Sequence, residues 1–353
     1  MKMNTEIKIG RFTVDNTSPV FIIAEAGVNH NGDIALAKKL VAAAKNAGAN
    51  AVKFQTFDPE SLVTANAPKA EYQKEKTGHD GSQQSMLSQL ALSHNDFRSL
   101  ATYASEQNIL FLSTPFSTTD ADFLDAIGVP AFKIGSGDLT NIPLLEDIAR
   151  KTKPIILSTG MATLDEIHEA VDTITREGNT DLILLHCVSL YPTPLPQANV
   201  RSMQTLAASC KCLAGYSDHT ISDEAALAAT ALGARVIEKH ITLDKTLPGP
   251  DHAASLEPDA FAEFVTKIRN TEAVLGSAQK IISPEEKAVA AVARKSIVTN
   301  VPLKKNAVIT RDHLTIKRPG TGIPPKFIKE VIGKKLIADV PADMPLQWDM
   351  FQS

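Results

Sequence analysis

The sequence has 353 residues and a formal net charge of −4, with 43% hydrophobic and 22% charged residues, as is usual for a globular protein. The slightly acidic balance argues against a nucleic-acid-binding or membrane-surface protein. Because no segment reads as a signal peptide or a membrane span, we expect a cytoplasmic protein whose three cysteines (Cys187, Cys210, Cys212) are reduced.

Short apolar strands alternate with helices over most of the chain. IKIG and RFTV near the N-terminus predict a hairpin that closes the bottom of the following domain. The strands that follow are FIIAE, AVKF, ILFLST, AFKIG, IILST, LILLHC, LAGYS and RVIEKH, and the helices are Leu36 to Ala47, a helix after Ser93, 119–127, 141–150, 163–177, near 200–208, 222–232 and 259–275. Eight such repeats predict a parallel (β/α)₈ TIM barrel.

Two segments depart from this alternation. Residues 57–92 form a long polar stretch containing Tyr72, and we expect a lid or mobile flap there, because long loops in compact domains usually have a function. After residue 276 the elements become very short and rich in turns. We therefore predict a barrel domain over 1–280, a linker over 281–294 and a small compact module over 295–353.

Polar or ionisable residues follow every predicted barrel strand. They are Glu25, Lys53, Gln55, Ser113, Thr114, Lys133, Ser136, Ser158, His186, Ser217, Asp218, His219, Glu238 and His240. The C-terminal ends of the strands form the active-site mouth of a TIM barrel. The repeated series indicates an enzyme.

His219 and His240 end consecutive strands, so a barrel would bring both imidazoles to one rim. Two imidazoles without a third nearby cysteine or histidine suit a divalent ion that completes its shell with oxygen. That description fits manganese, magnesium or cobalt better than a structural zinc site. Otherwise each histidine simply forms a hydrogen bond with a neighbouring strand end.

Carboxylates and lysines are predicted beside this pair. Glu25 ends the first strand, next to the eighth, and is the candidate general acid or base; a salt bridge to Lys53 is the alternative. Glu238 should also point inward, either toward the site or into a packing layer. Lys53 and Lys133, with the hydroxyls of Ser136, Ser158 and Ser217, indicate an anion pocket, because an unpaired buried ammonium is costly.

Residues in two later loops have less specific signals. Asp251 and His252, after the eighth strand, could bind a polyhydroxylated ligand or form an ordinary turn. Tyr191, after the sixth strand, is either an aromatic facing the mouth or a turn anchor.

A series of motifs runs in order through nearly the whole chain. They are IIAEAGVNHNG, AVKFQTF, FLSTPF, FKIGSGDLTN, ILSTGMAT, HCVSLYPTP, GYSDHT, VIEKHITLD, GPDHAAS and ARKSIV…KRPGTGI. Together they resemble the bacterial sialic acid synthases, and the C-terminal module resembles their antifreeze-like (SAF, β-clip) domain.

The resemblance implies a transferase that condenses phosphoenolpyruvate with N-acetylmannosamine, giving N-acetylneuraminate and phosphate by metal-dependent C–O cleavage. The alternative acceptor is 2,4-diacetamido-2,4,6-trideoxymannose, which would give N,N'-diacetyllegionaminate.

Site residues carry over position by position. His219 and His240 match the family's manganese ligands. Lys53, Thr114, Lys133, Ser136, Ser158 and Ser217 match positions that bind phosphoenolpyruvate. Glu25, Tyr191 and Asp251 match acceptor-sugar or catalytic positions. Arg318 matches an arginine that one subunit inserts into the barrel of the other, so a domain-swapped homodimer is implied.

Two departures from the family pattern and two rival functions accompany this interpretation. Ser189 replaces an asparagine found in some relatives just before the YPTP segment. Asp138 replaces a longer glutamate, which puts its contact with the sugar in doubt. A Schiff-base pyruvate aldolase would use a lysine such as Lys133 and need neither metal nor phosphate release. An ice- or carbohydrate-binding module would explain the C-terminal region but not the polar barrel mouth.

Overall fold

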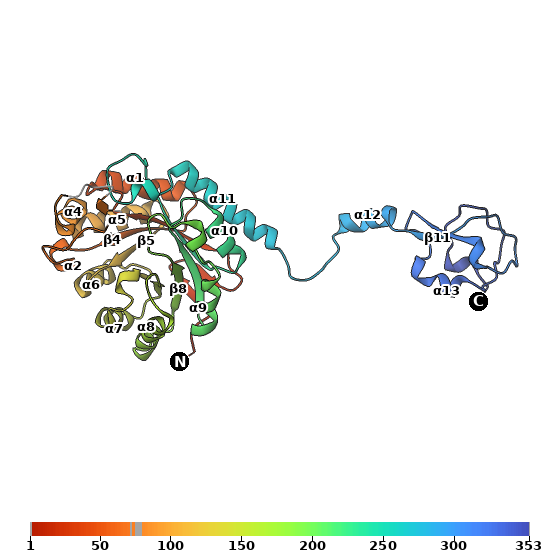
Figure 1. Ribbon diagram of the computed structural model, residues 1–353, viewed down its shortest axis with the longest axis horizontal. Helices are drawn as coiled ribbons and strands as arrows, with labels where there is room; N and C mark the ends of the chain where they lie inside the picture. The colour runs from red at the N-terminus through yellow and green to blue at the C-terminus, as the bar shows by residue number, and fades with distance from the viewer. Residues whose placement is uncertain (1, 71–72, 75–79, 353) are drawn as a thin grey trace. The chain divides into compact units, whose positions relative to one another are not determined.

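The computed structural model describes residues 2–70, 73–74 and 80–352. The chain forms two compact units, Met1–Gly276 and Ser277–Ser353. Each is described by itself, starting with the larger one (Figure 1).

Eight parallel strands form the sheet of the first unit, confirming the predicted barrel. They are β3 (Phe21–Gly27), β4 (Ala51–Thr56), β5 (Leu110–Pro115), β6 (Phe132–Ile134), β7 (Ile155–Ser158), β8 (Leu182–Cys187), β9 (Leu213–Asp218) and β10 (Val236–His240). Their order is β5-β4-β3-β10-β9-β8-β7-β6, and β5 also packs against β6, so the sheet closes on itself. The first and eighth barrel strands, β3 and β10, are therefore neighbours.

Helices follow the strands close to the predicted positions. They are α1 (Ile34–Asn46), α5 (His94–Glu106), α6 (Thr118–Ala126), α7 (Ile142–Arg150), α8 (Leu164–Arg176), α9 (Ser202–Cys210), α10 (Glu224–Ala231) and α11 (Pro258–Leu275). Several N-termini are fixed by side-chain caps: Ser93 and Thr163 form capping boxes with Asp96 and Glu166. Such caps satisfy backbone N–H groups that the helix itself leaves unpaired.

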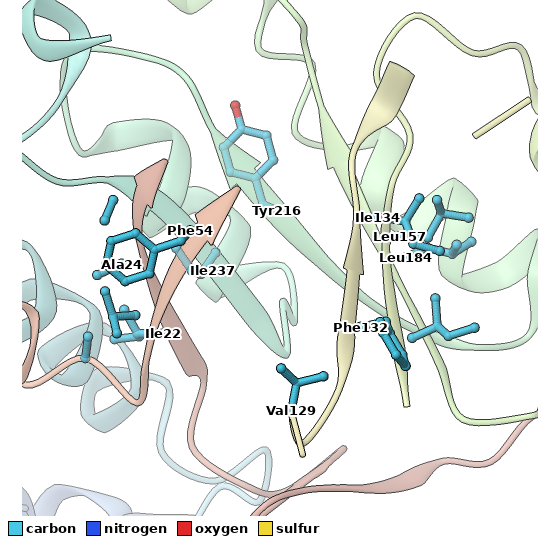
Figure 2. Packing of buried hydrophobic residues seen from close by; sticks show 14 of the residues in the cluster. Ile22, Ala24, Phe54, Val129, Phe132, Ile134, Leu157, Leu184, Tyr216 and Ile237 are labelled. Carbon is cyan, nitrogen blue, oxygen red and sulfur yellow. The ribbon is translucent and has the colours of Figure 1, made fainter. Parts of the chain in front are cut away.

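The barrel core has two layers. Outward-facing strand residues pack against the helices; Figure 2 shows examples from several strands, including Ile22, Phe54 and Leu184. Inward-facing residues near the strand starts pack with Ile7 and Val14 of the hairpin β1 (Glu6–Ile9) and β2 (Phe12–Asp15). The hairpin therefore closes the bottom of the barrel, as predicted, and the polar strand ends lie at the opposite, open end.

Residues 57–92 are not simply a polar loop, and in this respect the prediction was wrong. The segment includes α2 (Pro59–Leu62) and α4 (Gln83–Leu90). Met86 and Leu90 of α4 pack with Val28 and Phe57 in a small apolar cluster separate from the main core. Burial of these few spaced apolar residues stabilises the helix despite its polar surroundings. Tyr72 lies outside the described residues.

The second unit has its own small core. It contains α12 (Pro284–Ala293), an antiparallel pair β11 (Ser296–Thr299) and β12 (Leu314–Lys317), and the short helix α13 (Ile328–Val331). Ile297, Ile309, Val331, Leu336 and Leu346 are among its fully buried side chains. Helix α12 lies within the segment predicted as a linker. None of the helices in the described part of the chain combines the length and apolar character needed to cross a bilayer.

His30, in the turn after β3, is a buried group with a consequence for stability. Its side chain is 1% exposed, and Nδ1 accepts a hydrogen bond of 3.1 Å from the backbone of Gly32. Burial lowers the pKa of His30 from the ordinary 6.5 to about 4, because the charged form loses its hydration. The neutral form thus stabilises the fold above pH 6.5, and this contribution is lost as the pH falls toward 4.

When the pH falls from 7 to 5, we expect His30 to lower the free energy of unfolding by about 2 kcal/mol. The reason is that His30 takes up a proton in the unfolded chain at a higher pH than in the folded protein. Denaturant unfolding of the wild type and of His30→Gln at both pH values measures this difference. The variant should lose less stability on acidification by about that amount. Parallel losses in the two proteins would contradict the assignment.

Candidate active site

A cavity of about 490 Å³ opens at the C-terminal ends of the barrel strands. Its polar lining comprises Glu25, Lys53, Gln55, Gln73, Gln83, Thr114, Lys133, Ser136, Ser158, Ser189, Tyr191, Ser217, His219, Glu238, His240 and Asp251. Most of the site residues predicted in the barrel are in this lining; Ser113, Asp138, His186, Asp218 and His252 are not. Residues from strands far apart in the sequence thus meet in one pocket, as the fold requires.

His219 and His240 lie side by side in the cavity, with ring centroids 5.7 Å apart. His219 Nδ1 is 2.7 Å from the carbonyl oxygen of Val188. A carbonyl oxygen only accepts, so Nδ1 carries the hydrogen and Nε2 keeps its lone pair. The ring of Tyr191 packs against His219 with centroids 4.2 Å apart, which restricts the orientation of the imidazole.

Both imidazoles are held neutral. Burial lowers the pKa of His219. Burial, with the charges of His219 and Lys53, lowers the pKa of His240 well below its ordinary value. His240 Nδ1 is buried and meets no hydrogen-bond partner among the residues that the structure describes. Two neighbouring neutral imidazoles, one of which has a buried nitrogen without a hydrogen-bond partner, are chemically suitable metal ligands.

The pair fits a divalent ion that takes its other ligands from oxygen. Within the described ranges, no group of three or more histidine, cysteine, aspartate or glutamate side chains forms a preformed metal cluster. A structural zinc site needs four protein ligands, whereas manganese, magnesium and cobalt accept water and ligand oxygens. Asp251 is an acidic neighbour of the pair, with Oδ2 3.9 Å from His240 Nδ1.

Two lysines and two glutamates form a charge network at the base of the cavity. Lys53 Nζ is 2.8 Å from Glu25 Oε2 and 3.8 Å from Glu238 Oε2, and Lys133 Nζ is 3.7 Å from Glu238 Oε1. The lysines are therefore not unpaired, which corrects the reasoning behind the predicted anion pocket. Glu238 points inward between them and compensates both charges. The ion pair between Glu25 and Lys53, given as the alternative for Glu25, is also present.

The two glutamates differ in their readiness to take up a proton. Burial raises the pKa of Glu25, although Lys53 opposes the shift. Burial acts in the same direction on Glu238, but Lys133 and Lys53 outweigh it and lower the pKa to about 2. Glu238 is thus ionised at neutral pH, whereas Glu25, with its raised pKa, is the more readily protonated of the two. This favours Glu25 as the general acid or base.

Several hydroxyl and N–H groups lie close to Lys133 and form hydrogen bonds with one another or with its ammonium group. Its Nζ donates to Ser158 Oγ over 2.7 Å, and Ser136 Oγ accepts from the backbone N–H of Gly160 over 2.9 Å. A Cβ atom on Gly160 would lie only 2.3 Å from Ser189 Oγ. Only glycine allows this close approach of backbone and side chains. Across the cavity, Lys53 Nζ donates to Thr114 Oγ1 over 3.2 Å.

Asp251 lies in the loop after β10, directly before the short 3₁₀ helix η3 (His252–Ala254). Burial and the charge of Glu25 raise its pKa to about 7. His252 does not line the cavity: Nδ1 is 2.7 Å from Thr242 Oγ1 and Nε2 is 3.1 Å from Asn31 Oδ1. Asp251 therefore faces the site, and His252 ties its loop to the turn after β3.

Four predicted polar residues point away from the cavity. Asp138 ends the 3₁₀ helix η1 (Ser136–Asp138), and its carboxylate accepts a 3.0 Å hydrogen bond from Asn141. Ser113 Oγ contacts Thr56 Oγ1, His186 Nε2 contacts the carbonyl of Ala198, and Asp218 pairs with Lys239. Ser113, His186 and Asp218 occupy the outward-facing positions of their strands, because side chains alternate between the two faces.

The cavity also contains Gln55, which was expected at the barrel mouth without a specific role, and residues that were not expected there. Gln55 Nε2 donates to Glu25 Oε1 over 2.9 Å and so orients that carboxylate. Cys187 Sγ lies 3.1 Å from Ser136 Oγ. An apolar wall, defined as Val28, Met86, Leu87, Leu90 and Phe116, closes one side of the cavity. Three residues of the wall, Met86, Leu87 and Leu90, lie in the segment 57–92, which reads as polar, so no sequence pattern indicated them.

Comparisons with known proteins assign a family or domain type to each of the two units. Residues 40–280 match the NeuB family and residues 294–352 match the SAF domain. The chain is 45% identical over 337 residues to an N,N'-diacetyllegionaminic acid synthase of Legionella pneumophila, covering 94% of this chain and 95% of that protein. It is 37% identical over 346 residues to the N-acetylneuraminate-9-phosphate synthase of Homo sapiens, covering 97% and 95%.

A solved structure of a sialic acid synthetase is also similar to this chain in fold and sequence. The crystal structure of an N-acetylneuraminic acid (sialic acid) synthetase from Leptospira borgpetersenii superposes with a TM-score of 0.73 at 37% sequence identity. The match covers 82% of this chain and 96% of that one.

Proposed function

This chain belongs to the NeuB family, and from that premise we propose that it is a metal-dependent nonulosonate synthase. It condenses phosphoenolpyruvate with an N-acylated mannosamine-type sugar and releases phosphate. The observation that carries the proposal is the meeting of two neutral imidazoles, His219 and His240, with Lys53, Lys133 and Glu25 in one cavity. The cavity thus contains side chains that could hold a metal ion, bind an anion and transfer a proton.

His219 and His240 would hold the divalent ion. When bound, the ion supplies Lewis acidity toward the aldehyde oxygen of the open-chain sugar. Lys53, Lys133 and the hydroxyls of Thr114, Ser136, Ser158 and Ser217 bind the carboxylate and phosphate of phosphoenolpyruvate through charge-assisted hydrogen bonds. Holding both reactants in one orientation removes much of the entropic barrier to their reaction.

Bond formation and cleavage follow from this arrangement. The methylene carbon of phosphoenolpyruvate bonds to the aldehyde carbon, whose oxygen becomes a hydroxyl. The oxygen of a water molecule adds to C2, and Glu25 accepts the proton that this water gives up and returns it to the former aldehyde oxygen. The bond between C2 and the phosphate oxygen then breaks, which leaves a 2-keto acid and inorganic phosphate. The hydroxyl now on C2 loses its own proton to the departing phosphate when the ketone forms.

The apolar wall bears on the choice of acceptor. A 6-deoxy sugar presents a methyl group where N-acetylmannosamine presents a hydroxyl. We propose that C6 of the acceptor lies against this wall. Met86, Leu87 and Leu90 would then offer a methyl group apolar contact, whereas a hydroxyl buried there would lose its hydrogen bonds to water. In addition, the relative from Legionella pneumophila is an N,N'-diacetyllegionaminic acid synthase, which supports the same acceptor. Of the two expected acceptors, 2,4-diacetamido-2,4,6-trideoxymannose is therefore the better supported.

We expect phosphate release from manganese, phosphoenolpyruvate and 2,4-diacetamido-2,4,6-trideoxymannose to exceed that with N-acetylmannosamine by about 10-fold or more, since one misplaced polar group costs at least about 1.4 kcal/mol. A phosphate assay with each sugar, followed by mass spectrometry of the products, makes the comparison. Faster reaction with N-acetylmannosamine would reverse the assignment of the acceptor. No phosphate with either sugar would contradict the synthase itself.

One observation favours the rival aldolase. Burial lowers the pKa of Lys133, as the lysine of a Schiff-base enzyme requires. Its Nζ, however, donates to Ser158 and lies beside the carboxylate of Glu238, which favours the protonated form. Borohydride trapping with pyruvate distinguishes the two enzymes: the synthase should not be inactivated, whereas an aldolase would be.

A further inference from the structure

A buried ion pair lies directly behind the two histidines. Lys239 precedes His240 on β10, Asp218 precedes His219 at the end of β9, and the two residues are partners in the parallel register of these strands. Lys239 Nζ is 2.8 Å from Asp218 Oδ2, and both side chains are almost completely buried. Since side chains alternate along a strand, the pair points outward while the histidines point into the cavity.

Every donor of this lysine is used to hold the backbone after β9. Besides the carboxylate of Asp218, Lys239 Nζ donates to the carbonyl oxygens of Thr220, at 2.5 Å, and Ser222, at 3.1 Å. Asp218 Oδ1 accepts from the backbone N–H of Thr220 over 2.9 Å. The pair thus fixes residues 218–222, the turn that contains His219, to the strand that carries His240.

Stability alone does not account for the pair. Burying two charges costs about as much hydration as their attraction returns, so well-packed apolar residues often replace such pairs without loss. The pair also has an aromatic neighbour, since Nζ lies 5.8 Å from the ring centre of Phe264 in α11. What an apolar pair could not reproduce is the set of hydrogen bonds that orients the turn.

We propose that Lys239 and Asp218 are positioning residues that set the placement of His219 relative to His240 and thereby the affinity for the divalent ion. The inference rests on the proposed metal-binding role of the two histidines. Groups that orient metal ligands from behind typically change metal affinity by about 10- to 100-fold when they are replaced.

The test measures Mn²⁺ binding directly, without turnover. Electron paramagnetic resonance gives the dissociation constant for the wild type and for the double variant Asp218→Asn/Lys239→Met, with thermal unfolding as the check on folding. Removing both charges together avoids leaving one of them buried and unpaired. We expect a folded double variant whose dissociation constant for Mn²⁺ rises about 10- to 100-fold. An unchanged dissociation constant would overturn the inference.

A second variant covers the case in which the double variant does not fold. Lys239→Arg keeps the charge, but a planar guanidinium cannot direct donors from one nitrogen to Asp218, Thr220 and Ser222. It should bind Mn²⁺ several-fold more weakly while unfolding near the wild-type temperature. Wild-type affinity in a folded Lys239→Arg protein would equally overturn the inference.

A matched control comes from the other side of the barrel. Thr56 Oγ1 and Ser113 Oγ, 2.7 Å apart and buried, join the ends of β4 and β5, which carry no histidine. Thr56→Val/Ser113→Ala should leave the affinity for Mn²⁺ at the wild-type value. If the wild type itself binds no Mn²⁺, the proposed function fails; if all the variants bind as the wild type does, only this inference fails.

Discussion

Replacing His240 by alanine is expected to lower turnover of phosphoenolpyruvate by at least about 10³-fold, because Lewis-acid activation contributes several kcal/mol and about 1.4 kcal/mol corresponds to a factor of ten. With one imidazole gone, His219 would remain as the only histidine ligand beside the carboxylate of Asp251. The affinity for Mn²⁺ should fall in parallel. A coupled phosphate assay and a Mn²⁺ titration measure the two effects.

The matched control for this variant is His186→Gln. His186 also ends a barrel strand, but its Nε2 contacts the carbonyl of Ala198 on the outer side of the sheet. The control should need as much Mn²⁺ as the wild type, even if it is less stable. Near-normal turnover in His240→Ala would contradict the placement of the metal.

Arg318→Ala is expected to fold and to form dimers, yet to lose about 10²- to 10³-fold in turnover, the range for removal of one donor that stabilises developing charge. Arg318 follows β12 in the second unit and is exposed there. The proposal is that this guanidinium acts in the barrel of the partner subunit. Steady-state assays, with sedimentation to establish the dimer, measure the two properties. Normal turnover in a dimeric variant would exclude a catalytic arginine at this position.

Mixed dimers distinguish action on the partner from action within one chain. When Arg318→Ala and His240→Ala proteins are unfolded together and refolded, a mixed dimer has one intact barrel that faces an intact arginine, provided that the arginine crosses over. Random pairing then restores about a quarter of wild-type activity, since half of the dimers are mixed and one site in each works. An arginine acting within its own chain would restore none.

The fold could be predicted because each local signal agreed with the others. Apolar strands of the right length alternated with helices, and residues such as Ser93 and Thr163 marked helix starts that the structure confirms. Closure of the barrel then brought β3 next to β10, so Glu25 was expected beside His240, and the register pairs these two residues. A fold can be predicted from its sequence when the local structural preferences agree with the global fold.

The details of the site were less predictable, for physical reasons. Side chains along a strand alternate between the two faces of the sheet, so the face of a given residue depends on the register of the strand. Because the prediction did not fix that register, it grouped Ser113, His186 and Asp218 with the residues that face the cavity. Compensation of Lys53 and Lys133 by Glu238 depends on distances between three strands, which no local pattern contains. The apolar wall could not be foreseen because its helix, α4, is stabilised by tertiary packing.

One measurement tests the central claim most directly: the fate of the oxygen that joins C2 of phosphoenolpyruvate to phosphorus. Metal-stripped protein is given the acceptor sugar and phosphoenolpyruvate labelled with heavy oxygen at that position, and Mn²⁺ is returned stepwise. The account predicts that labelled phosphate and a nine-carbon 2-keto acid form together, in proportion to the bound metal. Unlabelled phosphate, or undiminished product formation by protein without any divalent ion, would contradict it.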